Sequence, residues 1–160
     1  MAENRAHVFS LENRVVLITG GSSGIGLATA RLLLERGSNV VITGRDEDRI
    51  TRVVEELKGD FSGASRVLGV RADATSLGDI DRLMDLIREQ HGHLDGLFAN
   101  AGAAIAQRTK EITEEDFDYS VNVNLKGVLF TVQKSLPLFD HVSDRLVTIP
   151  GESPRLDGLD

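Results

Sequence analysis

Residues 19–26 read TGGSSGIG and combine three spaced glycines with two serines, which are residue types that can bind phosphate. Gly20 permits a sharp turn, Gly24 has no side chain to keep the backbone away from a pyrophosphate, and Gly26 allows close packing behind the loop. The apolar run before this stretch is typical of a strand. The run after it is typical of a helix, whose free N–H groups and partial positive charge favour an anion. The stretch therefore predicts a loop that holds the diphosphate of a dinucleotide.

Glycines can also merely punctuate a strand-to-helix loop, and a glycine pattern alone is weak evidence for a nucleotide. The elements around the loop favour the nucleotide, because strands and helices alternate on both sides of it. Short β-branched runs without polar alternation are typical of strands buried on both faces of a parallel sheet. Five such runs occur, at residues 15–19, 39–43, 66–72, 94–99 and 145–149.

Helical periodicity follows each of the first four runs. A first helix is expected over 25–36 with Gly37 at its end, Asp46 can cap a second, and a fourth runs from about Thr113 to Leu136. The positions expected to be buried are Ile25, Ala28, Leu32 and Leu33 in the first helix, Ile50, Val53, Val54 and Leu57 in the second, and Ile80, Leu83, Met84 and Ile87 in the third. Alternating strands and helices predict an α/β fold with right-handed crossovers and a parallel sheet.

Composition limits the classes of function. A chain of 160 residues fits one domain. A formal charge of −7 without a concentrated basic stretch argues against nucleic acid as a partner. The chain has no cysteine, which excludes disulfides and thiolate metal sites. Neither a signal peptide nor an apolar run approaching the ~20 residues of a membrane span is present in the sequence, so we expect a cytoplasmic protein without membrane contact.

His91 and His93 flank a glycine and raise the hypothesis of a metal site. A third ligand at a recognised spacing is missing from the sequence around them. Two histidines in such a loop are better explained as surface residues, so we expect no metal.

Three motifs in this order resemble the short-chain dehydrogenase/reductase family. The family's Thr-Gly-x-x-x-Gly-x-Gly is matched at 19–26, its Asn-Asn-Ala-Gly at 99–102 with Ala99 in place of the first asparagine, and VNLKG follows at 123–127. The resemblance covers roughly residues 11–142. It implies a Rossmann-like, doubly wound parallel sheet of about five strands with flanking helices, incomplete at its C-terminal side. An NAD(P)-binding domain over 1–149 and an irregular tail over 150–160 are expected.

The end of the second strand predicts which dinucleotide binds. Dinucleotide-binding chains normally place an acidic residue there for NAD, or an arginine for the 2′-phosphate of NADP. Gly44 stands where the resemblance places the acidic residue, and Arg45 can pair with a phosphate by charge-assisted hydrogen bonds. NADP is therefore favoured over NAD. Alternatively, Arg45 only solvates the loop beside Asp46 and Asp48, whose carboxylates could compete for the guanidinium.

The resemblance assigns further residues to the cofactor. Asp73 matches the aspartate that accepts a hydrogen bond from the adenine amino group, although a lone aspartate more often caps a turn or a helix. The turn Asn100-Ala101-Gly102 would line the ribose and phosphate side. The predicted cofactor-binding residues are Thr19, Gly20, Ser22, Ser23, Gly24, Ile25, Gly26, Arg45, Asp73, Ala74, Asn100, Ala101 and Gly102.

The family exchanges a hydride between nicotinamide and a carbonyl or alcohol, while a tyrosine phenol exchanges the proton. A phenol has an ordinary pKa of about 10, and a lysine four residues later lets it work near neutral pH. Of the family's catalytic set only the asparagine is matched, by Asn124, which would support a proton-relay water. Alternatively, Asn124 is a buried amide that compensates a helix irregularity. Tyr119, the single tyrosine, has Val123 four residues later and is not expected to be the catalytic acid. Ser153 is too displaced to be assigned.

Two hypotheses from different classes follow. In the first, the chain is a truncated or frame-altered product of an NADP(H)-dependent oxidoreductase gene, whose full-length product acts on a small carbonyl or alcohol. In the second, it is a non-catalytic dinucleotide-binding or interaction module. PGESPRLDGLD at 150–160 resembles neither the family's continuation nor a folded element, which favours the first. An unpaired fifth strand and an apolar helix face around Val121 to Val132 predict a homo-oligomer.

Overall fold

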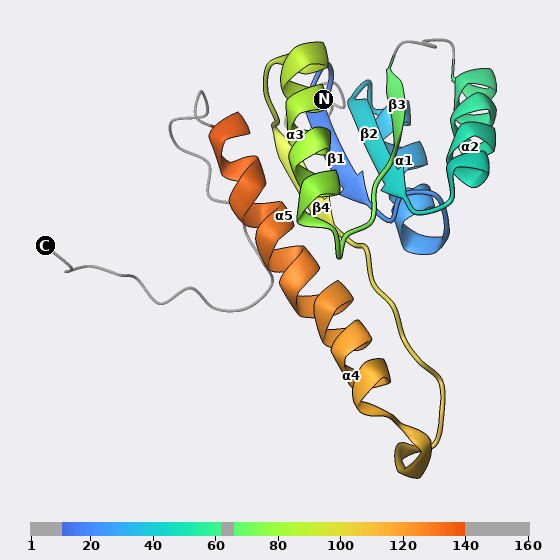
Figure 1. The fold of residues 1–160 in the computed structure, drawn as a ribbon. Coiled ribbons are helices and arrows are strands. Elements are labelled where there is room, and N and C mark those ends of the chain that lie inside the picture. Colours follow the sequence, from blue (N-terminus) through green and yellow to red (C-terminus); the bar gives the residue numbers. More distant parts are fainter. Residues whose placement is uncertain (1–10, 62–65, 140–160) are drawn as a thin grey trace, which may run out of the picture.

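The computed structural model describes residues 11–61 and 66–139 (Figure 1). Its strands form one parallel sheet in the order β3-β2-β1-β4. The strands are β1 (Val15–Thr19), β2 (Asn39–Gly44), β3 (Val67–Arg71) and β4 (Gly96–Ala99). The chain moves outward from β1 to β3 and then returns to the other side of β1, so the order reverses between β1 and β4. The predicted α/β fold with a Rossmann-like parallel sheet is confirmed.

The described sheet has four strands instead of about five. The run at 145–149, expected as a fifth strand, lies outside the described residues, as does the tail expected over 150–160. Among the strands that the structure describes, β4 pairs with β1 alone and forms one edge of the sheet.

Helices follow the strands as the periodicity predicts. They are α1 (Gly24–Glu35), α2 (Glu47–Asp60), α3 (Leu77–His91), and α4 (Glu114–Val121), which continues through a π-helical segment (Asn122–Gly127) into α5 (Val128–Ser135). Short 3₁₀ turns cover Thr109–Glu111 and Leu136–Leu138. In the ranges 11–61 and 66–139, no helix combines the length and the apolar composition that crossing a membrane requires.

Two hydrophobic clusters place helices on both faces of the sheet. On one face, Ile18 and Ile42 pack with residues of α1 and α2 such as Ala30 and Leu57. On the other face, the buried residues of α3 pack against the sheet, and Phe130 of α5 packs beside them. Figure 1 shows α5 lying alongside α3, whereas α4 projects beyond the end of the sheet where the strands finish. The result is a doubly wound, three-layered arrangement with its ligand-accessible end at the carboxyl ends of the strands.

The predicted buried face of α1 is wrong. Ile25 is 73% exposed, Leu32 is 50% exposed and Ala28 is also exposed, whereas Gly26, Ala30 and Leu34 are buried. The sequence LATARLLL is apolar on most sides, so periodicity does not distinguish one face from another. Gly26 determines the rotation of the helix, because only a residue without a side chain can face the preceding loop at this distance. In α2 and α3, where charged residues cover the outer face, Ile50, Val53 and Leu57, and Ile80, Leu83, Met84 and Ile87, are buried as predicted.

Candidate functional site

A cavity of 410 Å³ lies at the carboxyl ends of the four strands, next to the point where their order reverses. Crevices at this place are where open α/β sheets bind ligands. The structure brings to it most of the predicted cofactor residues: Gly20, Ser22, Ser23, Gly24, Ile25, Arg45, Asp73, Ala74, Asn100, Ala101 and Gly102. Residues that the sequence analysis did not assign also line it: Thr43, Gly44, Asp46, Arg49, Ala72, Ala103, Tyr119 and Val123.

The glycine loop is packed too closely for larger residues. A Cβ atom on Gly26 would lie 2.5 Å from the carbonyl oxygen of Gly20, so no side chain fits between the loop and α1. Gly20 has a φ angle of +68°, and a Cβ atom there would lie 3.0 Å from the Cα atom of Ala101. The loop is therefore pressed against both α1 and the turn after β4. Gly26 is buried and Thr19 is only 5% exposed, and neither lines the cavity.

The N-terminus of α1 differs from those of the three helices that follow it. Ser23 occupies the N-cap, but its side chain makes no capping hydrogen bond, and the first turn contains no acidic residue. By contrast, α2, α3 and α4 begin with the capping side chains Asp46, Ser76 and Thr113, each followed by acidic residues in the first turn. The partial positive charge of α1 is thus left without a neutralising side chain at the cavity wall, which favours an anion there.

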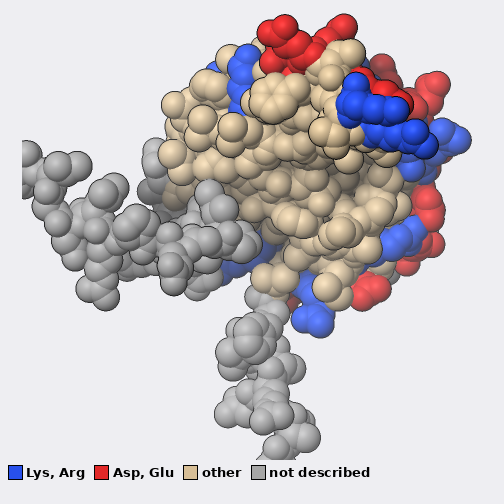
Figure 2. All heavy atoms as spheres, turned by 90° about the horizontal axis from the view of Figure 1, so that it is seen from below, with Lys and Arg blue, Asp and Glu red and all other residues tan. Residues whose placement is uncertain are grey.

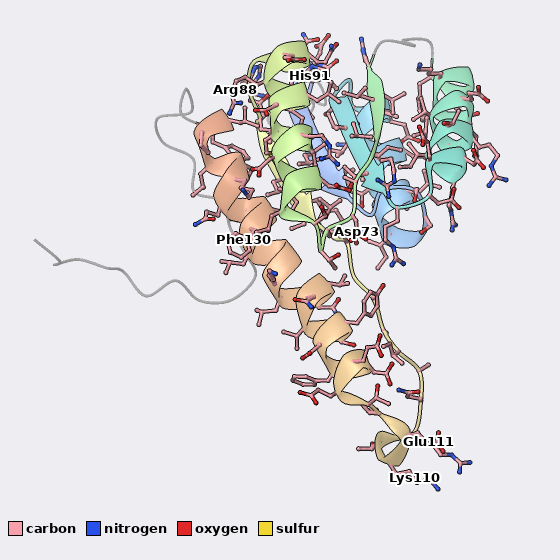
Figure 3. The ribbon with its side chains drawn as sticks, viewed as in Figure 1. Asp73, Arg88, His91, Lys110, Glu111 and Phe130 are labelled. Carbon is pink, nitrogen blue, oxygen red and sulfur yellow. The ribbon has the colours of Figure 1, made fainter. Side chains whose placement is uncertain are left out.

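Asp73 lies at the carboxyl end of β3, below the sheet in Figure 3. Its Oδ1 atom accepts hydrogen bonds from the backbone N–H and the hydroxyl of Thr75, both at 2.8 Å. The alternative interpretation, a turn-forming aspartate, is therefore correct for this oxygen. The residue nevertheless lines the cavity, and no hydrogen bond within the described part of the chain uses its Oδ2 atom. One carboxylate can thus form the turn and still offer an acceptor to a ligand.

Asp79 holds the Asp73 segment in place. Its buried carboxylate accepts hydrogen bonds from the backbone N–H of Asp73 at 2.9 Å and from the hydroxyl of Ser76 at 3.0 Å. Arg82 donates to the same carboxylate at 2.5 Å. The hydrogen bond from Asp73, then that from Ser76 and the charge of Arg82, hold the pKa of Asp79 below its ordinary value against the opposing effect of burial. The ionised side chain therefore fixes the segment that carries Asp73.

Arg45 follows β2 and meets a residue from a distant helix. Its Nη1 atom donates a hydrogen bond to the Tyr119 hydroxyl at 2.6 Å, and the guanidinium carbon lies 6.0 Å from the centre of the tyrosine ring. Asp46, one of the two carboxylates expected to compete for this guanidinium, instead caps α2 by accepting from the backbone N–H of Arg49. Among the described residues, no salt bridge joins Arg45 to Asp46 or Asp48.

At the end of the molecule that carries the cavity, charged residues lie mostly at the rim. Figure 2, which views the molecule from below, shows uncharged residues across the middle and Lys, Arg, Asp and Glu towards the edges. The cavity lining itself holds two arginines, Arg45 and Arg49, and two aspartates, Asp46 and Asp73. Asp46 and one oxygen of Asp73 accept hydrogen bonds from the protein, whereas the guanidinium groups of Arg45 and Arg49 are the charged donors of the lining.

Comparison with known proteins identifies the family. A family model described as short chain dehydrogenase matches residues 14–150. The chain belongs to the short-chain dehydrogenase family. It is 36% identical over 148 residues to the oxidoreductase asL5 of Sarocladium schorii, which covers 92% of this chain and 57% of that protein.

Solved short-chain dehydrogenase structures have the same fold. L-sorbose reductase from Gluconobacter frateurii, solved with NADPH and L-sorbose, superposes with a TM-score of 0.76 at 27% identity, covering 83% of this chain and 50% of that one. The RhlG/NADP complex of Pseudomonas aeruginosa also gives a TM-score of 0.76, at 30% identity, with coverage of 84% and 51%. The chain thus spans about half the length of the relatives that it matches.

Asn124, the residue matched to the catalytic asparagine of short-chain dehydrogenases, lies in the π-helical segment between α4 and α5. A helix irregularity is therefore present, as the alternative interpretation expected. The amide is exposed and not buried, however, and its hydrogen bonds leave the helix: Oδ1 accepts from the backbone N–H of Ala103 at 3.0 Å and Nδ2 donates to its carbonyl at 2.7 Å. In this structure Asn124 fixes the segment that follows the turn at 100–102.

The histidine pair lies away from the cavity. His91 ends α3, and Figure 3 shows it at the opposite end of that helix from Asp73. The Nε2 atom of His93 lies 3.1 Å from a carboxylate oxygen of Asp95, and burial, followed by the charge of His93, lowers the pKa of His91. Over 11–61 and 66–139, no three His, Cys, Asp or Glu side chains gather in a way that could hold a metal ion.

Proposed function

We propose that this chain is the NADP(H)-binding part of an oxidoreductase that transfers hydride between NADP(H) and a small carbonyl or alcohol compound. The observation that carries the proposal is one cavity with the uncapped N-terminus of α1 on one wall and the guanidinium of Arg45 on another. A dinucleotide with a 2′-phosphate carries anionic groups at two separate places, and each wall offers donors to one of them.

The residues present fit such a cofactor. A Cβ atom on Gly24 would meet no protein atom within 4 Å, so the backbone at the start of α1 is open to a ligand in the cavity. Ser22, Ser23 and the α1 backbone would hold the diphosphate, Arg45 the 2′-phosphate, and the free Asp73 oxygen the adenine amino group. The turn at 100–102 would line the ribose side. Two relatives of known structure, L-sorbose reductase and RhlG, carry NADPH or NADP, which supports the choice.

Hydride donation and acceptance would come from the nicotinamide ring of the bound cofactor. The side chains of this chain bind and orient it. The hydroxyl of the single tyrosine, Tyr119, accepts a hydrogen bond from Arg45 at the cavity, and Val123, not lysine, stands four residues later. We therefore propose that the 160-residue chain alone binds the dinucleotide without turnover. In isolation it would then behave as the non-catalytic dinucleotide-binding module of the second hypothesis.

We also propose that the chain self-associates. Large apolar side chains remain exposed along α4, the π-helical segment, α5 and the 3₁₀ turn that follows: Phe117 at 62%, Leu125 at 65%, Leu129 at 59% and Leu136 at 50%. Contiguous apolar surface of this kind is uncommon on a monomer. A second copy of the chain is the simplest partner that could cover it.

Two measurements on the purified chain test the proposal. The first is thermal unfolding with NADPH or NADH, and the second is turnover, followed by absorbance, with a panel of ketones and aldehydes. A ligand at 100 times its dissociation constant stabilises the folded state by about 2.7 kcal/mol, which is enough to measure. We expect a larger shift with NADPH than with NADH and no turnover. No shift with either dinucleotide would refute the binding function. Reproducible turnover that Tyr119→Phe abolishes would refute the exclusion of Tyr119 as the catalytic acid.

A further inference from the structure

Arg45 and Tyr119 are joined across the cavity although they lie 74 positions apart in the chain. Arg45 extends from the carboxyl end of β2, and Tyr119 comes from the last turn of α4. Their hydrogen bond of 2.6 Å and the position of the guanidinium 6.0 Å from the ring centre form one contact, and both residues line the cavity. No sequence motif links the two residues.

The contact restricts Arg45 without using up its donors. A guanidinium has five N–H groups, and the Tyr119 hydroxyl accepts from one of them. Arg45 is otherwise exposed on a loop, where a long side chain samples many rotamers. Because the tyrosine already fixes the Arg45 side chain, binding of a phosphate costs less conformational entropy. A pair of N–H groups on the guanidinium is left for bidentate contact with that phosphate.

We infer that Tyr119 is a positioning residue that holds Arg45 at the cavity wall and thereby strengthens selection for a 2′-phosphorylated dinucleotide over its unphosphorylated counterpart. The inference rests on the proposed function, because it needs Arg45 to bind the 2′-phosphate. It assigns to Tyr119 a role in cofactor selection and none in proton transfer.

A double-mutant cycle separates this role from a general structural one. Dissociation constants for NADPH, NADH and adenosine 2′,5′-bisphosphate are measured by calorimetry for the unaltered chain, Tyr119→Phe, Arg45→Gln and the double variant. Tyr119→Phe keeps the ring and removes the hydroxyl. We expect it to weaken binding of NADPH and the bisphosphate by about threefold to tenfold, in line with the entropy of one immobilised side chain, and to change NADH binding by less than about twofold. In the Arg45→Gln background, Tyr119→Phe is expected to change nothing.

Phe117→Leu is the matched control. Phe117 lies two residues earlier on the same helix, is 62% exposed and does not line the cavity. This variant is expected to leave all three dissociation constants unchanged, and thermal melts of each variant check that α4 remains folded.

The outcomes distinguish this inference from the proposed function. If Arg45→Gln weakens NADPH binding but Tyr119→Phe leaves it unchanged or strengthens it, the positioning role is overturned and NADP selection by Arg45 stands. Loss of NADPH affinity that is equal with and without Arg45 also overturns the positioning role. If Arg45→Gln alters neither dinucleotide, or if the unaltered chain binds none of the three probes, both the positioning role and NADP selection are overturned.

Discussion

Asn100 donates two hydrogen bonds to Thr19: its backbone N–H donates to the Thr19 Oγ1 atom at 3.0 Å, and its side-chain amide donates to the Thr19 carbonyl at 3.1 Å. These two bonds join the carboxyl ends of β1 and β4, where the strand order reverses. The glycine loop continues from one of these residues and the turn at 100–102 from the other. The shape of the cavity therefore depends on Thr19, a buried residue that does not line it.

We expect Thr19→Val to lower the free energy of unfolding by about 1–3 kcal/mol, the usual cost of leaving a buried polar group unpaired. Valine keeps the branched shape but removes the oxygen that accepts from the N–H groups of Asn100 and Ala101. Denaturant unfolding measures the effect. Thr51→Val is the control, because Thr51 is exposed on α2 and donates only to the Glu47 carbonyl. Equal stability of the two variants would contradict the role of the Thr19 oxygen.

Gly26→Ala is expected to destabilise the fold and to weaken dinucleotide binding. The added methyl group would lie 2.5 Å from the Gly20 carbonyl oxygen and 3.0 Å from the Gly21 Cα atom, so backbone has to move, at a cost of about 1–3 kcal/mol. Gly59→Ala is the matched control in α2, where a Cβ atom would meet nothing within 4 Å. There alanine is expected to stabilise the helix by roughly 0.5–1 kcal/mol. Melting temperatures that change in the same direction for both variants would argue against the packing explanation.

The sequence predicted best where charge and apolar residues separate cleanly. In α2 and α3 the outer positions are charged, so periodicity alone identified the buried residues. It failed in α1, where apolar residues occupy most sides and close packing of Gly26 against Gly20 sets the rotation. That contact is tertiary, and periodicity carries no information about it.

The candidate site was predictable where it consists of contiguous motifs at strand ends. The glycine loop, Asp73 and the turn at 100–102 converge because the carboxyl ends of parallel strands meet at one edge of the sheet. Tyr119 and Val123 were not assigned to the cavity, because their approach depends on how the helix from 114 to 135 crosses the sheet. The capping box of Thr113 and Asp116 indicates where that helix begins, but not its direction.

Replacing Gly44-Arg45 by Asp-Ile is expected to reverse the preference between NADPH and NADH. The exchange removes the guanidinium and supplies a carboxylate for a ribose hydroxyl. A Cβ atom at position 44 would lie 2.9 Å from the Ser22 hydroxyl oxygen, so Ser22 has to rotate to admit the aspartate. Arg45→Ile alone is the control: it should lose NADPH affinity without a gain for NADH. Unchanged relative affinities in the double variant, measured by calorimetry, would refute selection at this strand end.

Self-association is expected to depend on the apolar face of the long helix. Leu125→Gln combined with Leu129→Gln should shift the chain towards monomer in sedimentation velocity at tens of micromolar, because both side chains are more than half exposed on that face. Leu32→Gln is the control, since Leu32 is 50% exposed on α1, away from that face. A monodisperse monomer of the unaltered chain, with a cooperative melt, would be evidence against association.

Asp79 is expected to make stability depend on pH in the acid range. Because hydrogen bonds hold its folded-state pKa below the ordinary value, the unfolded chain binds more protons than the folded chain at pH values between the two. The stabilisation is therefore fully present above about pH 5 and is lost as the pH falls through the folded-state pKa. Asp79→Asn removes this contribution. The free energy of unfolding of this variant should be lower than that of the unaltered chain at neutral pH, and it should fall less steeply below about pH 4.

Asp85→Asn, which removes an exposed carboxylate from the same helix, is measured in parallel at each pH. Parallel pH profiles for the unaltered chain and Asp79→Asn would show that the buried carboxylate does not couple folding to protonation.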